Sequence, residues 1–239
     1  MKALAVRNSK EILRDPINLL FGLAFPVALL LLLAAIQSNI PVQLFDASSL
    51  TPGICVFGLS FMTLFSAQLL AKDRGSAMLQ RLYATPLRAR DFILAYTLPM
   101  LPLSILQCLV CCATGLLLGM TPTWNLLFGI VLIVPVSLLF ISLGLLCGSV
   151  FNDKQVGGIC GALLTNLTAL TSGIWFDPMM VGGVFGKIAN AMPFLHAVEL
   201  ERAAFRGELS LPHLWWVLGY AAVAGIAAIA LFLRQMKRQ

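Results

Sequence analysis

The chain has 239 residues, of which 59% are hydrophobic and only 11% are charged, and its formal net charge is +6. Soluble domains are typically about 45–50% apolar and about 25% charged, so this composition excludes an ordinary soluble domain and indicates a membrane protein. The basic residues are scattered among apolar runs rather than gathered in one stripe, so we expect no nucleic-acid partner.

The first sixteen residues have the spacing of an amphipathic helix. Arg7, Lys10 and Arg14 share one helical face, and Ile12 lies roughly opposite. This pattern predicts an interfacial helix over residues 1–16. The helix either packs against the rest of the chain or is a solvated lead-in that only fixes the orientation of the protein.

Six apolar segments follow, and each reaches the roughly 20 residues that a membrane-spanning helix needs. They cover residues 17–36, 50–71, 92–119, 123–151, 156–176 and 214–233. Several contain proline, which membrane helices tolerate when neighbouring groups satisfy the freed carbonyls. The sequence therefore predicts an all-α polytopic membrane protein with six transmembrane helices, folded as a single domain over residues 1–239.

The distribution of basic residues orients these six segments. Thirteen of the sixteen basic residues fall on one side, and only Lys187, Arg202 and Arg206 fall on the other. Loops rich in lysine and arginine stay in the cytoplasm. Both termini and the connection over residues 72–91 are therefore predicted to be cytoplasmic.

Residues 72–91 form a charged island between the second and third apolar segments. A short helix is predicted to start after Ser76, which can cap it, and to stop at Thr85 because Pro86 disfavours a helical residue before it. The apolar face of this helix consists of Met78, Leu79, Leu82 and Tyr83, and its basic residues include Arg81 and Arg88. A basic helix with one apolar face at the membrane surface is predicted to contact lipid headgroups or a soluble partner.

The fifth apolar segment is the most polar of the six. Its small and hydroxyl residues share one helical stripe that includes Gly161, Thr165, Thr168 and Ser172, with Asn166 beside it. Such residues commonly allow close helix–helix contacts in membranes. The alternative is that they line a path for an amphiphilic substrate, and the two roles could coexist at a dimer interface.

A long connection over residues 177–213 joins the fifth and sixth apolar segments on the outer side. Residues 178–191 are moderately apolar but too short to cross the membrane, and residues 193–207 have an amphipathic pattern. We assign Glu199, Glu201, Arg202 and Arg206 to the polar face of the second part. The connection is predicted to form a re-entrant or surface helical hairpin.

Recognisable catalytic and cofactor motifs are missing from the sequence. The segment Gly182–Ile188 resembles a phosphate-binding loop but lacks its first glycine and its Ser or Thr. All six cysteines fall in apolar segments with no histidine or carboxylate beside them in the sequence, so no metal site is predicted. The apolar segments contain no buried carboxylate or histidine chain for coupling to an ion gradient, so we expect transport energy to come from another source.

Two stretches resemble the membrane subunits of ATP-binding-cassette exporters of the ABC-2 type. Residues 52–96 contain a Pro-Gly at the start of the second apolar segment, and residues 193–207 are similar to the outer segment of that family. The other matching residues are Asp73, Arg74, Gly75, Leu79, Leu82, Thr85, Pro86 and Leu87.

This resemblance implies a six-span permease that pairs with a second permease copy and binds two soluble ATPase subunits. It implies that Met78, Leu82 and Tyr83 insert into a groove of the ATPase, with Arg81 and Arg88 as rim contacts. The substrate route would run between two permease copies along the first, second and fifth segments, in a bacterial or archaeal cytoplasmic membrane. ATP would be hydrolysed on the partner, so the chain itself is expected to be no enzyme and to need no cofactor.

Short outer loops and few outer aromatic residues favour a small hydrophobic or amphipathic substrate, such as a drug-like compound or a lipid. A lipid-linked glycan remains an alternative. A haem permease is another, although the exposed histidine or tryptophan cluster that we expect of one is not clear in the sequence. A non-transporting scaffold or a membrane enzyme is the alternative from a different class.

Overall fold

The computed structural model describes residues 2–40, 46–76 and 89–236, and within these ranges the chain forms helices and no strand. The first half contains α1 (Lys2–Leu13), α2 (Pro16–Leu19), the π-helical turn η1 (Leu20–Ala24), α3 (Phe25–Gln37), α4 (Ala47–Gly75), α6 (Ala89–Thr97) and α7 (Met100–Leu117). The second half contains α8 (Asn125–Val150), α9 (Asp153–Val156), the π-helical segment η2 (Gly157–Leu164), α10 (Thr165–Thr171), α11 (Pro178–Val181), α12 (Gly183–Ala191), α13 (Pro193–Arg206) and α14 (Leu211–Met236). The all-α prediction is confirmed.

Five helical stretches of the described residues are long and apolar enough to cross a membrane. They are Pro16–Gln37, Ala47–Gly75, Asp91–Leu117, Asn125–Val150 and Leu211–Arg234, and they match five of the six predicted segments. The remaining segment, 156–176, is helical only up to residue 171, so its apolar helical part is shorter than the roughly 20 residues that a span needs. The sixth span therefore remains a prediction.

Local chemistry explains where the helices differ from the expected boundaries. Asp15 ends the N-terminal helix early because its side chain caps the next one, accepting a hydrogen bond from the Asn18 backbone at 3.1 Å. Pro99 interrupts the third apolar segment between α6 and α7. Gly173 adopts φ of +77°, a conformation that favours glycine and ends the helix that begins at α9.

Helix α4 is the centre of the bundle, because almost all of its side chains are buried whereas the first and last spans are largely exposed. It packs against α8 through Gly144 and Gly148. A Cβ atom on Gly148 would lie 2.6 Å from the carbonyl oxygen of Ala67, so the two helices approach more closely than any side chain would allow. This small-residue pair therefore serves helix packing.

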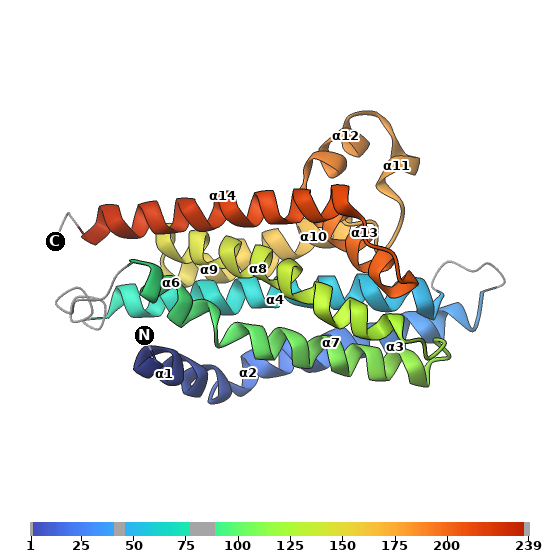
Figure 1. Cartoon of the computed structure of the whole chain (residues 1–239), viewed down its shortest axis with the longest axis horizontal. Helices are drawn as coiled ribbons and strands as arrows, with labels where there is room; N and C mark the ends of the chain where they lie inside the picture. The colour runs from blue at the N-terminus through green and yellow to red at the C-terminus, as the bar shows by residue number, and fades with distance from the viewer. Residues whose placement is uncertain (1, 41–45, 77–88, 237–239) are drawn as a thin grey trace.

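The helices run roughly along one long axis (Figure 1). The start of α1, the end of α4, the start of α6 and the end of α14 lie at one end of the bundle. Helices α11 and α12 project sideways near the opposite end, next to α13. The arrangement separates a junction near both termini from a cap of helices α11 to α13, which we call the outer cap, while the assignment of the two ends to the cytoplasm and to the outside remains a prediction.

Candidate functional site

An aromatic ladder connects the first two spans to Trp175, in the segment that follows α10. Phe21 and Phe25 contact Phe61 with ring centroids 6.2 and 5.6 Å apart, Phe57 contacts Phe61 at 6.1 Å, and Phe57 contacts Trp175 at 6.4 Å. Phe21 and Phe25 are exposed, whereas the α4 residues are buried. The ladder therefore presents a polarisable apolar surface beside the central helix. We did not predict this ladder from the sequence, although the sequence contains pairs of phenylalanines four residues apart.

The structure brings together only part of the predicted polar stripe of the fifth apolar segment. Thr165, Thr168 and Ser172 are buried, Gly161 is partly buried, and Asn166 is exposed on another side of the helix. Thr165 and Thr168 donate their hydroxyls to carbonyls of their own helix at 3.0 and 2.9 Å. Three of the predicted path residues therefore face the bundle, and Asn166 faces away from it.

Two π-helical segments lie next to α4. One is η1 in the first span and the other is η2 in the fifth apolar segment, and both contact α4. The wider turn of η2 lets Thr165 reach the carbonyl of Cys160, five residues earlier. Such segments occur often at functional sites, and here they flank the helix that carries the buried half of the aromatic ladder.

A buried ionic junction holds the end of α4 next to α1 and α6. The Asp73 carboxylate is almost completely buried, accepts a hydrogen bond from Arg7 at 2.6 Å and accepts another from the Tyr96 hydroxyl. Asn8 donates to the backbone carbonyl of Ala95 at 3.0 Å. The N-terminal helix is therefore packed against the bundle, which resolves the choice between packing and a solvated lead-in.

The next residue attaches α4 to a different helix. Arg74 donates hydrogen bonds to the carbonyls of Gly148 at 2.7 Å and Phe151 at 3.2 Å. Asp73 and Arg74 thus connect the base of the 72–91 island to both sides of the bundle. The predicted docking residues Met78, Leu79, Arg81, Leu82, Tyr83 and Arg88 lie outside the described residues.

At the outer end, Arg202 connects α13 to two other elements. Its guanidinium pairs with Glu199, three residues earlier, at 2.9 Å and donates to the Gly173 carbonyl at 3.0 Å and the Ser49 carbonyl at 3.4 Å. Arg202 therefore ties the outer cap to the end of the fifth apolar segment and to the start of α4.

Glu201 corrects our assignment of the polar face of α13. Its carboxylate is fully buried, and neither oxygen has a hydrogen-bond partner among the described residues. Burial raises the pKa of this carboxyl well above its usual value. The helical spacing could have predicted this burial. One stripe of α13, with residues three or four positions apart, includes position 201 and the buried residues Phe194, Ala197, Val198 and Ala204.

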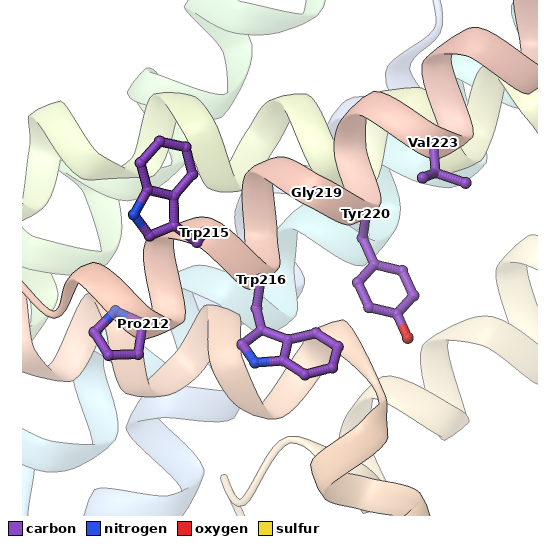
Figure 2. A pocket seen from close by; sticks show the side chains of 6 residues that line it. All are labelled: Pro212, Trp215, Trp216, Gly219, Tyr220 and Val223. Atoms are coloured by element: carbon purple, nitrogen blue, oxygen red, sulfur yellow. The ribbon is translucent and has the colours of Figure 1, made fainter.

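A histidine pair and an aromatic groove lie where α13 meets α14. The Nδ1 atoms of His196 and His213 are 2.8 Å apart, and Trp216 stacks on His196 with centroids 4.8 Å apart. A groove of about 570 Å³ on α14 is lined by Pro212, Trp215, Trp216, Gly219, Tyr220 and Val223. Figure 2 shows Trp216 and Tyr220 projecting from the same side of α14.

Residues 1–205 match the ABC-2 type transporter family. The chain belongs to this family. It is also similar to the putative transport permease ycf38 of Pyropia yezoensis, with 30% identity over 213 residues that cover 84% of this chain and 72% of the relative. The ycf38 permease of Porphyra purpurea is 31% identical over 210 residues, covering 83% and 71% of the two chains.

Membership of the ABC-2 family makes the chain a multi-pass membrane protein of a transport family whose permeases are generally not enzymes themselves. The matched region includes the aromatic ladder, the Asp73–Arg74 junction and Arg202. Helix α14, including its groove, follows the matched region.

Proposed function

We propose that this chain is the membrane subunit of an ABC exporter in a bacterial or archaeal cytoplasmic membrane. A separate ABC ATPase, present in two copies, hydrolyses ATP and docks on the 72–91 island. Two permease copies move a small hydrophobic or amphipathic substrate, such as a drug-like compound or a lipid, out of the cytoplasm or the inner leaflet.

The junction at the end of α4 is the observation that carries this proposal. Asp73 and Arg74 lie at the start of the proposed docking segment and bind α1, α6 and α8 through charged hydrogen bonds. Charged hydrogen bonds are stronger than neutral ones and hold fixed geometry. A displacement applied to the docking segment would therefore move the central helix together with its neighbours.

The substrate route in this proposal runs along the exposed side of the aromatic ladder, between two permease copies. Phe21 and Phe25 give this side an apolar surface that suits a hydrophobic or amphipathic molecule. Asn166 supplies an exposed polar group on the fifth apolar segment. The outer cap of α11 to α13 closes the route at the other end.

The proposal is tested by reconstituting the permease with its ATPase in liposomes and measuring ATP hydrolysis and substrate transport together. Leu82→Glu places a charge on the apolar face of the docking helix, so it is expected to abolish assembly or to separate hydrolysis from transport. Leu82→Met keeps the volume and apolar character and should behave like the wild type. Normal assembly and transport by Leu82→Glu would contradict the docking assignment.

A haem permease is the second candidate, because the structure contains the outer histidine and tryptophan cluster that the sequence did not reveal clearly. His196, His213 and Trp216 are in contact, and Trp215 is exposed beside them. Histidine is an axial ligand of haem iron in several protein classes. Titration of the purified chain with haem tests this candidate, which predicts a Soret shift that His213→Ala removes.

A further inference from the structure

Three cysteines form a compact sulfur cluster between two spans. Cys55 comes from α4, Cys108 and Cys112 come from consecutive turns of α7, and all three are buried. Their Sγ atoms all lie within 4.8 Å of one another, and those of Cys108 and Cys112 are 4.0 Å apart. None of the three forms a disulfide in this structure.

These separations suit a single metal ion. Sulfur atoms bound to one ion through bonds of about 2.3 Å lie about 3.8–4.0 Å apart in a tetrahedral or trigonal arrangement. Cys108 and Cys112 already have this separation, and a small rotation of the Cys55 side chain would complete the set. Thiolates select soft, closed-shell ions such as Cu⁺ and Zn²⁺.

Two buried side chains in this part of the bundle have oxygen atoms without a hydrogen-bond partner among the described residues. Both carboxyl oxygens of Glu201 belong to this set, and α13, which carries Glu201, packs against α4, which carries Cys55. Gln107 donates its amide to the Cys55 carbonyl at 3.3 Å, but its Oε1 atom has no partner in the same described set. An ion bound at the cluster would give these oxygen atoms a positively charged partner.

We propose that Cys55, Cys108 and Cys112 bind one thiophilic closed-shell metal ion, Cu⁺ or Zn²⁺, beneath the outer helix α13. Our expectation of no metal site rested on the sequence, which could not show that Cys55 on one span meets Cys108 and Cys112 on another. With Cu⁺ the three sulfurs suffice, whereas Zn²⁺ needs a fourth ligand, for which the Glu201 carboxyl on α13 is the candidate. The ion joins α4 to α7 under α13 and stabilises the outer half of the bundle.

Metal titration of the full chain, purified in detergent under reducing conditions and stripped with a chelator, tests this site. Cu⁺ and Zn²⁺ are added separately against a competing chromogenic chelator, and bound metal is counted by mass spectrometry. We expect about one ion per chain, and a loss in affinity of about 100-fold or more for Cys112→Ala. Cys160→Ala is the control, because Cys160 is also buried but lies on η2, outside the cluster.

Glu201→Gln distinguishes the two ions. Cu⁺ binding that survives this change identifies a three-sulfur site, and Zn²⁺ binding that is lost identifies the carboxylate as a ligand. The proposal is overturned if the wild type binds no more of either ion than a Cys55→Ala/Cys108→Ala/Cys112→Ala variant, or if Cys160→Ala abolishes binding equally. The number of ions bound per wild-type chain tests the proposal even where a variant fails to fold.

Discussion

Asp73 and Arg74 are consecutive residues at the end of α4, yet their side chains bind helices on different sides of it. Asp73 accepts a hydrogen bond from Arg7 of α1 at 2.6 Å, and Arg74 donates to the Gly148 carbonyl of α8 at 2.7 Å. The pair therefore fixes the base of the 72–91 island to two parts of the bundle. In our account, this is how movement of a docked ATPase reaches the membrane helices.

The Arg7–Asp73 pair should contribute measurably to stability. Removing one partner of a buried ion pair typically costs about 3–5 kcal/mol, but Arg7 remains about one-third exposed, so we expect a coupling energy of about 1–2 kcal/mol. A double-mutant cycle of Arg7→Ala and Asp73→Ala, followed by unfolding in detergent, measures it. Lys10→Ala, on the exposed side of α1, is the control. A coupling energy near zero would contradict the junction.

The sequence predicted the apolar helices well because length and composition alone determine them. It could not predict that Arg7 meets Asp73, 66 positions away, because contacts between helices depend on how the bundle packs. The sulfur cluster was hidden for the same reason, since Cys55 and Cys108 lie on different spans. The burial of Glu201 was different: the helical spacing contained the signal, and its charge led us to assign it to the wrong face.

The contact between α4 and α8 should tolerate no side chain at Gly148. Gly148→Ala would place a Cβ atom 2.6 Å from the Ala67 carbonyl oxygen, so we expect it to lower the free energy of unfolding by about 1–3 kcal/mol. Gly158→Ala is the matched control, because nothing lies within 4 Å of its added Cβ. The thermal unfolding midpoint of each variant in detergent measures the difference, and equal midpoints would refute the packing role.

Packing and path lining in the fifth apolar segment can be separated with two leucine substitutions. Thr168 is fully buried, so Thr168→Leu should lower stability through overpacking. Asn166 is exposed and bonds to the Ala162 carbonyl of its own helix at 2.8 Å. Asn166→Leu should therefore leave stability nearly unchanged but reduce transport. Unchanged transport in Asn166→Leu would remove this residue from the proposed route.

The outer cap should loosen in mild acid. Burial lowers the pKa of His196, and repulsion from His213 acts in the same direction, while the Asn190 carbonyl and Glu199 oppose the shift. Because a free histidine titrates near pH 6.5, the unfolded chain binds a proton between that pH and the lower folded pKa. Stability should thus be constant above about pH 6.5 and fall as the pH drops below it.

Thermal unfolding of the detergent-solubilised chain at a series of pH values measures this effect. His196→Gln removes the titrating group, so its unfolding midpoint should depend less on pH between about 5 and 7 than that of the wild type. An identical dependence in the two proteins would show that another group is responsible.

The most direct test of the central claim is affinity purification of this permease from crosslinked membranes, with mass spectrometry of the proteins that remain bound. Our account predicts a soluble ABC ATPase in about equal amount to the permease, and its loss in Leu82→Glu but not in Leu82→Met. Recovery of the permease without an ATPase, from crosslinked membranes as well, would contradict an ATP-driven exporter and favour a scaffold or a membrane enzyme.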